Sequence, residues 1–402
     1  SGSMKIVRSR FRRVIAAFLA CIVLIDSPLE GEVPKLPYAE PESVGMSSAK
    51  LAELDSVVAE EIEKGVFPGC VIAVGRHGRL VLLRAFGHRQ VEPTKAPMTT
   101  DTLFDLASVT KPVATATSVM ILVDRGKVDL GAPVATYVPE FGQNGKEKIT
   151  VFQLLTHQGG LIADNPIADY MDGSAKAWER IFALEPIVEP GAKFIYTDVG
   201  FLMLAELVRR VSGKNVHEFS QEHVFTPLGM DETTYRPDEV QRRLAAVNEQ
   251  RDDRWMQGEV HDPRSYRLGG IAGHAGLFST AEDLAVFAQM MLGRGEYGGA
   301  RILDEDTVAR MLRPNDVAGR LWGLGWGIRT EAVPNHPDWQ VLGHLGYTGT
   351  SVRFSPDLDL FVVFLSNRVH PKDPGSLKAI VSAIRRVWDT TAESVETAES
   401  SR

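Results

Sequence analysis

Cysteine is nearly absent from the chain, since only Cys21 and Cys70 occur among its 402 residues. Cys21 falls in a candidate leader, so we expect the mature protein to have no internal disulfide even if it is exported. Cys70 lies in an apolar stretch and is expected to be a small core residue. A fold held together by disulfide bonds is therefore excluded.

Positive charge is also scarce, because Lys and Arg total 44 against 52 for Asp and Glu, which gives a net charge of -8. A chain without a basic surface is poorly suited to neutralise phosphates, so we expect no nucleic-acid partner. With 44% hydrophobic and 24% charged residues, the composition is that of a soluble globular protein of one large or two ordinary domains.

Long apolar runs are missing as well. The uncharged run at residues 14–25 has twelve residues, short of the roughly 20 that a membrane-spanning helix needs. We interpret residues 1–3 as a cloning scar before Met4 and residues 1–25 as a signal or anchor segment, which predicts export to the periplasm or cell envelope. The basic residues ahead of the run are those of a secretory signal: Lys5, Arg8, Arg10, Arg12 and Arg13.

The processing of this leader stays open. No clear small-x-small pattern follows Ile25, so an uncleaved anchor is an alternative to a cleaved signal. Cys21 is weakly similar to a lipoprotein site, and the pair Arg12-Arg13 to a twin-arginine signal. Any membrane association is expected through this N-terminal segment only.

Strand signals occur toward both ends of the chain, with helical signals between them. An extended lead-in at 26–45 is followed by a helix from Ser47 that Gly65 closes, and by a β-hairpin at 70–74 and 80–83. Helices are predicted after the capping box at Thr150, at 199–211 and at 284–292. The C-terminal strands are predicted at 322–328, 340–343, 350–354 and 360–365, under a last helix at 377–388.

This order predicts an α/β fold of the α+β sandwich kind, in which an antiparallel sheet is covered by N- and C-terminal helices and carries an inserted all-helical subdomain. We assign residues 46–105 and 260–389 to the sheet domain and residues 106–259 to the helical subdomain. Residues 390–402 are too polar to bury and are predicted to form a mobile tail. The cleft between the two parts is the expected site.

A candidate nucleophile lies at Ser108-Val109-Thr110-Lys111. Helical positions three apart share a face, so the Lys111 amine can lie beside the Ser108 hydroxyl and accept its proton. The helix N-terminus also favours developing negative charge. The uncharged run at 112–123 predicts a buried helix here, whereas the similar Ser47-Ser48-Ala49-Lys50 fits an ordinary N-cap.

Three motifs together resemble the serine β-lactamase and penicillin-binding-protein superfamily, in particular its class C β-lactamase, D,D-peptidase and esterase branch. Residues 103–111 resemble the nucleophile motif, 194–201 the Tyr-x-Asn motif and 343–350 the third motif, and the likeness extends over about 45–370. The resemblance implies a β-lactamase/transpeptidase-like fold. The catalytic residues that it implies are Ser108, Lys111, Tyr196 and His344.

The same resemblance implies further roles near these residues. The backbone N–H groups of Ser108 and Tyr347 would form the oxyanion hole. Trp326 and Trp322 either wall the pocket or pack in the core. The residues expected to bind substrate are Asp198, Gly346, Thr348 and Trp326.

Two departures from the family pattern change what is expected. Asp198 stands where Asn is usual, and an anion beside Lys111 favours the charged lysine, which shifts the proton-transfer role toward Tyr196. His344 replaces a lysine and carries only part of its charge near neutral pH, so efficient β-lactam hydrolysis is not expected.

The proposed chemistry needs no cofactor and no metal. A zinc site is an alternative for His157, His261, Asp262 and His274, but the glycines around them more simply indicate close backbone approach. We therefore predict an exported serine hydrolase that cleaves an amide or ester of D-Ala peptide or β-lactam type through a Ser108 acyl-enzyme. The alternatives are a carboxylesterase acting on small esters and a slow-turnover β-lactam or cell-wall binding sensor.

Overall fold

The computed structural model describes Val33 and residues 35–329 and 339–395. The predicted leader at 1–25, the lead-in as far as residue 32, and residues 396–402 lie outside the described residues. Within the described part, no helix combines the length and apolar character that crossing a membrane requires.

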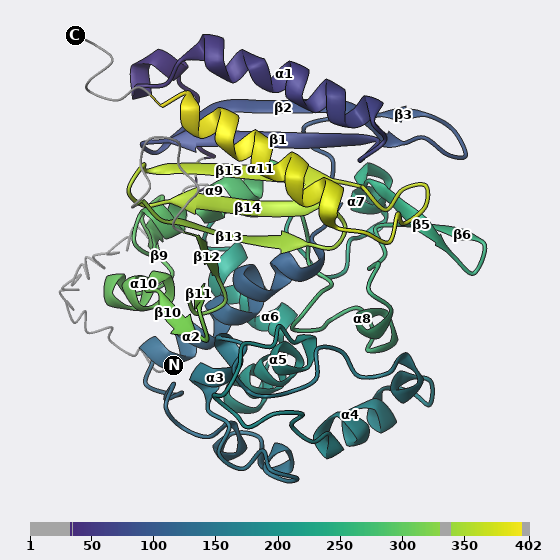
Figure 1. The fold of residues 1–402 in the computed structure, drawn as a ribbon, viewed down its shortest axis with the longest axis vertical. Helices are drawn as coiled ribbons and strands as arrows, with labels where there is room; N and C mark the ends of the chain where they lie inside the picture. Colours follow the sequence, from purple (N-terminus) through teal and green to yellow (C-terminus); the bar gives the residue numbers. More distant parts are fainter. Residues whose placement is uncertain (1–32, 34, 330–338, 396–402) are drawn as a thin grey trace, which may run out of the picture. The chain divides into compact units, whose positions relative to one another are not determined.

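A nine-stranded antiparallel sheet dominates the described part, with its strands in the order β10-β11-β12-β13-β14-β15-β1-β2-β3 (Figure 1). Ala73 of β1 pairs with Val363 of β15, so segments from opposite ends of the chain join the two halves of the sheet. The predicted hairpin and the three C-terminal strands are confirmed. The strands are Gly69–Arg76 (β1), Arg79–Gln90 (β2), Ala96–Pro97 (β3), Asn315–Val317 (β10), Arg320–Trp322 (β11), Gly327–Arg329 (β12), Val341–Gly346 (β13), Thr350–Ser355 (β14) and Leu360–Ser366 (β15).

The single strand predicted at 322–328 is wrong, because β11 and β12 are separated by a turn. Gly325 in this turn has φ +88°, a left-handed conformation that interrupts a regular strand and favours glycine. A Cβ at this position would lie 2.7 Å from the Ala116 side chain. The turn therefore packs directly on the helical segment that follows Lys111.

Two helices cover one face of the sheet: α1 (Ser48–Glu63) and α11 (Lys378–Glu393) (Figure 1). Leu54 and Trp388 from these helices join Phe364 of β15 in one buried apolar cluster. Alternate residues of β1 and β15 face this cluster and a larger one on the opposite side of the sheet, which explains why both strands are apolar throughout.

Residues at the two ends of the described chain depart from their predictions. The lead-in is not extended throughout, since Pro41–Val44 form a 3-10 turn. The tail assigned to 390–402 is wrong over its first residues, because α11 continues to Glu393 and buries Thr391 and Ala392. The polar composition of this stretch concealed its buried face.

The opposite face of the sheet packs against α9 (Ala281–Leu292), which Thr280 caps by accepting a hydrogen bond from the Asp283 N–H. Beside α9, the chain runs through β4 (Phe104–Asp105) and a 3-10 turn at Ala107–Val109. It then enters a π-helical stretch at Lys111–Ala116 and continues as α2. The predicted buried helix after Lys111 is confirmed, because residues 111–122 are all buried.

The inserted region is mostly helical, but the prediction of an all-helical subdomain at 106–259 is wrong. The strands β5 (Val247–Arg251) and β6 (Arg254–Gln257) form a hairpin. Its turn residues, Asp252 and Asp253, both have positive φ. Asp tolerates this conformation, which suits a tight hairpin turn. The remaining helices are α2 (Thr117–Asp124), α3 (Val151–Leu155), α4 (Ser174–Ala183), α5 (Asp198–Ser212), α6 (Val216–Ser220), α7 (Glu239–Leu244), α8 (Pro263–Arg267) and α10 (Glu305–Leu312), and the other short strands are β7 (Phe278–Ser279), β8 (Glu296–Tyr297) and β9 (Ala300–Arg301).

Candidate active site

Ser108 and Lys111 lie together as their spacing predicts. The Lys111 amine donates a hydrogen bond of 3.0 Å to the Ser108 hydroxyl and another of 3.3 Å to the His274 carbonyl. Lys111 is fully buried, and its amine is 2.5 Å from the Asp198 carboxylate. The candidate nucleophile is therefore in direct contact with a buried ion pair.

The backbone before Ser108 is held in an unusual conformation. Ala107 has φ +46°, which a non-glycine residue adopts only under local constraint. The buried Asp105 carboxylate supplies this constraint by accepting hydrogen bonds from the backbone N–H of Ala107 at 2.9 Å and of His261 at 2.6 Å. Sequence reasoning missed Asp105, although a carboxylate inside an apolar run was a usable signal.

Tyr196 precedes α5 and faces Ser108 and Lys111 from the helical region. Its hydroxyl interacts with both side chains, and the Lys111 amine lies 4.8 Å from its ring centroid. Burial raises the pKa of Tyr196, while the neighbouring Lys111 charge opposes this rise. The three side chains predicted to manage the reaction are thus brought together.

His157 is a support for Tyr196 that the sequence did not assign. Its ring lies 4.5 Å from the Tyr196 ring, and its Nδ1 accepts a hydrogen bond from the Thr197 N–H. Burial, with the Lys111 charge, holds the pKa of His157 well below its usual range, so the imidazole is neutral. The signal available in the sequence was its place between the capped helix α3 and a pair of glycines.

The electrostatics of Lys111 are set by two opposing effects. Burial alone lowers its pKa, but the charge of Asp198 and the contact with Tyr196 outweigh burial and raise it. Burial likewise raises the pKa of Asp198, and the charges of Lys111 and His274 reverse this to a net lowering. Lys111 is therefore an ammonium at rest, as the anion at position 198 led us to expect.

His344, in β13, faces the same cluster, with its ring 6.0 Å from that of Tyr196. Burial, reinforced by the Lys111 charge, lowers the pKa of His344 to about 3, so it is uncharged at neutral pH. Its Nδ1 contacts the Leu345 carbonyl at 3.0 Å, which leaves Nε2 buried with no hydrogen-bond partner. The partial positive charge expected from sequence is absent.

Gly346 and Thr348 hold the third motif against the segment around Leu106 that leads to Ser108, and their role in substrate binding stays a prediction. The Thr348 hydroxyl is buried and donates to the Asp105 carbonyl at 2.7 Å. A Cβ at Gly346 would lie 2.3 Å from the Leu106 carbonyl oxygen, so glycine permits the close approach of the two segments. Both contacts tie the third motif to the segment that leads to Ser108.

Tyr347 is held by contacts of its hydroxyl, its carbonyl and its ring. Its hydroxyl donates to Asp373 at 2.6 Å, and its carbonyl accepts a hydrogen bond from Arg368. Its ring stacks on His261 with centroids 5.8 Å apart. These contacts fix the backbone at the end of β13, where the oxyanion-hole prediction places one donor.

Trp326 lies in the core, whereas Trp322 lies near the candidate site. Trp326 is fully buried and packs against Phe354 and Phe287, which favours the core alternative for this side chain over the pocket wall. Trp322 instead lies 6.1 Å from His344 and 6.4 Å from Tyr196, measured between ring centroids. The Gly325 turn separates the two rings, and the sequence alone did not show which of them the turn sends into the core.

The four residues of the zinc alternative do not form one group. His261 pairs with Glu249 at 2.8 Å, and His157 supports Tyr196. His274 pairs with Asp262 at 2.9 Å, and both lie near Asp198, with their ligand-type atoms within 4.8 Å of one another. The ammonium of Lys111 already provides a cation beside these carboxylates.

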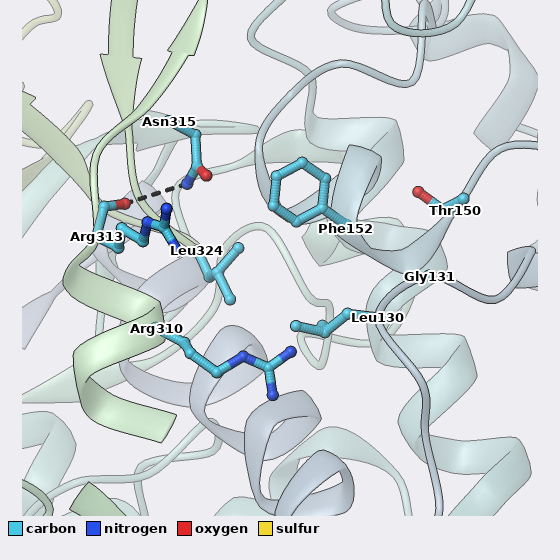
Figure 2. Close-up of a pocket in the computed structure, with 8 residues that line it drawn as sticks. All are labelled: Leu130, Gly131, Thr150, Phe152, Arg310, Arg313, Asn315 and Leu324. Carbon is cyan, nitrogen blue, oxygen red and sulfur yellow. Dashed lines mark hydrogen bonds between the residues drawn. The ribbon is translucent and has the colours of Figure 1, made fainter. Parts of the chain in front are cut away.

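A separate hollow of about 340 Å³ lies between the helical region and α10, and Figure 2 shows Phe152, Leu324 and Arg310 among its lining residues. None of the predicted site residues lines it. Leu324 belongs to the turn that packs on the helix after Lys111, so the hollow lies behind that turn. It is distinct from the Ser108 cluster.

Comparison with known proteins identifies the family of the chain. The family model of Beta-lactamase matches residues 54–384, which is most of the chain. The chain belongs to the Beta-lactamase family. It is therefore a serine hydrolase of the β-lactamase and D,D-peptidase type, as the sequence motifs predicted.

One relative and two solved structures illustrate what the chain is similar to. A Salmonella schwarzengrund protein named as a D-alanyl-D-alanine carboxypeptidase is 31% identical over 384 residues, covering 84% of this chain and 87% of the relative. A class C β-lactamase structure superposes with a TM-score of 0.71 at 18% identity, covering 87% of this chain and 98% of the other. An octameric penicillin-binding protein homologue from Pyrococcus abyssi gives a TM-score of 0.70 at 23% identity, covering 86% and 79%. These structures confirm the predicted fold.

Proposed function

We propose that Ser108 is the acylated nucleophile and that the enzyme hydrolyses the terminal amide bond of D-alanyl peptides. The contact between the Ser108 hydroxyl and the Lys111 amine, at 3.0 Å with Tyr196 against both, carries this proposal. The name of the Salmonella relative supports the substrate class.

In this mechanism the Ser108 oxygen attacks the carbonyl carbon of the penultimate D-Ala residue. The serine proton passes into the Tyr196–Lys111 pair, which acts as base when it has lost one of its own two protons. The pair then protonates the amine of the departing D-Ala as the C–N bond breaks. Water attacks the resulting ester, the pair accepts and returns a proton, and Ser108 is regenerated.

The charge that develops on the carbonyl oxygen needs donors in a fixed position. The backbone N–H groups of Ser108 and Tyr347 are the proposed oxyanion hole. Hydrogen bonds from Thr348 to the Asp105 carbonyl and from Thr350 to the Leu106 carbonyl support this, because they tie the segment of Tyr347 to the segment of Ser108.

The test uses a fluorescent penicillin and a peptide ending in D-Ala-D-Ala. We expect wild type to form a covalent adduct on the Ser108 peptide, located by mass spectrometry, and to release D-Ala. Ser108→Ala should do neither. Ser47→Ala is the matched control, since Ser47 lies in the same Ser-x-x-Lys pattern but caps α1, and it should react like wild type. Equal labelling of Ser108→Ala would overturn the nucleophile assignment.

A carboxylesterase is the second candidate, and the neutral His344 favours it. An uncharged imidazole with a free Nε2 offers a substrate no positive charge for a terminal carboxylate. Turnover of nitrophenyl butyrate, nitrocefin and the D-Ala-D-Ala peptide should be compared side by side. Faster ester than peptide hydrolysis would replace the peptidase proposal, and a long-lived adduct without turnover would indicate a binding sensor.

A further inference from the structure

Behind the Ser108 cluster lies a glycine-rich loop, residues 269–277, that contacts both helices of the site. The Gly273 carbonyl accepts a hydrogen bond of 2.7 Å from Thr115, which lies one turn after Lys111. A Cβ at Gly273 would lie 2.0 Å from the Phe201 carbonyl of α5, so the loop and the helix that begins at Asp198 touch through their backbones. The loop is therefore packed against the segments that supply both members of the Lys111–Asp198 ion pair.

His274, within this loop, reaches Lys111 in two ways. Its carbonyl accepts a hydrogen bond from the Lys111 amine at 3.3 Å. Its imidazole Nε2 lies 2.9 Å from the Asp262 carboxylate, and the ring is fully buried with Nδ1 unpartnered. Ligand-type atoms of His274, Asp262 and Asp198 lie within 4.8 Å of one another.

The charges in this cluster balance in pairs. Burial lowers the pKa of His274, but the carboxylates of Asp262 and Asp198 outweigh it and raise the pKa above its ordinary value. When His274 is protonated, the group holds two cations, Lys111 and His274, against two anions, Asp198 and Asp262. A buried charge without such a partner would carry a large desolvation cost.

We propose that the His274–Asp262 pair is a positioning device for Lys111, in which the protonated imidazole offsets the Asp198 charge while the His274 carbonyl anchors the amine. This inference rests on the proposed function, because it assigns the pair a role in the proton transfer from Ser108. His274 acts through Lys111 and Asp198 and touches no reacting atom.

The consequence is a pH dependence of acylation. The Tyr196–Lys111 pair is a base only after losing one proton, so the acylation rate rises with pH through the apparent pKa of the pair. This rising part of the pH profile is its acid limb. The Asp198 charge favours the protonated pair and moves the acid limb to higher pH, and the His274 charge moves it back to lower pH. Removing the imidazolium should therefore slow acylation at every pH below the apparent pKa of the Tyr196–Lys111 pair.

Other charged groups near the cluster act on the same limb. His157 and His344 are neutral over this range, for the reasons given above. Burial and the Asp198 charge raise the pKa of Asp164 to about 6, so it titrates within the measured range. Arg264 acts on Asp262 and Arg320 on His157, and a guanidinium keeps its charge over this range. Profiles are therefore compared in the Asp164→Asn background as well as in the natural sequence.

The experiment measures the second-order rate of Ser108 acylation by a fluorescent penicillin between about pH 5 and pH 10. We expect His274→Gln to move the acid limb up by about one pH unit, the lower end of the shift that a neighbouring charge produces. The rate near pH 7 should then fall about tenfold. Asp262→Asn should move the limb in the same direction, since the amide still caps α8 but no longer holds the imidazole proton.

The decisive comparison adds Asp198→Asn. Alone, this change should move the limb to lower pH; combined with His274→Gln, it removes one charge of each sign and should return the limb close to the wild-type position. A purely structural role for His274 predicts instead that the double variant is slower than either single one at every pH. His77→Gln is the matched control, because His77 contacts Asp359 at 2.8 Å on the exposed surface and should leave the profile unchanged.

Different results would contradict the proposed function and the proposed role of His274. If wild type gives no adduct on Ser108, the proposed function is wrong. If wild type is acylated but the double variant of His274→Gln and Asp198→Asn is slower than either single variant at every pH, with unchanged thermal unfolding, the function stands and the role of His274 is overturned.

Discussion

The Lys111 amine lies 2.5 Å from the Asp198 carboxylate, and Lys111 is fully buried. Removing one member of a buried ion pair leaves the other uncompensated, whereas removing both can be nearly neutral. This contact therefore joins the stability of the fold to the chemistry proposed for the site.

Lys111→Met separates these two contributions. We expect it to reduce acylation by roughly 10²–10⁴-fold and to lower the free energy of unfolding by about 3–5 kcal/mol, because Asp198 loses its cation. Adding Asp198→Asn should restore most of the stability and none of the acylation. Urea unfolding and adduct formation are measured on the same samples, and recovery of both together would exclude Lys111 from the proton transfer.

His344 predicts a loss of stability in acid. Its pKa is lowered from 6.5 to about 3 in the folded protein, so between these values the unfolded chain binds the proton that the folded one rejects. The stability that the neutral His344 contributes is fully present above about pH 6.5. It is lost as the pH falls toward 3, by at most roughly 1.4 kcal/mol of unfolding free energy per pH unit. Urea midpoints of His344→Gln should fall less steeply over this window than those of wild type. Parallel curves would contradict the neutral, buried state of His344.

Gly346→Ala tests the contact between the third motif and the nucleophile segment. The new Cβ would lie 2.1 Å from the Thr350 hydroxyl and 2.3 Å from the Leu106 carbonyl, so the backbone before Ser108 must move. We expect a cost of about 1–3 kcal/mol in unfolding free energy, typical of overpacking, and a more than tenfold loss of acylation. Gly131→Ala is the control, because its Cβ would meet only the Asp129 carboxylate, at 3.5 Å. Normal acylation by Gly346→Ala would show that Tyr347 does not depend on this contact.

Much of the fold follows from local patterns in the sequence. Apolar spacing located α1, capping residues located the starts of α3 and α9, and β-branched runs located β1 and β15. The errors fell where local signals conflict with long-range packing. The polar end of α11 buries Thr391, and the turn at Asp252 and Asp253 makes a hairpin inside a helical region.

By itself, the sequence determined the contact that depends on helical spacing, between Ser108 and Lys111, and through its motifs it indicated Tyr196 and His344. Only the tertiary structure decided that Lys111 is held by Asp198, that His344 is uncharged and that the His274–Asp262 pair lies beside them. It also decided that Trp322 lies near the site and Trp326 in the core. The reason is physical: burial and the charges of residues distant in sequence set a group's protonation state and exposure, and these are fixed only when the segments pack together.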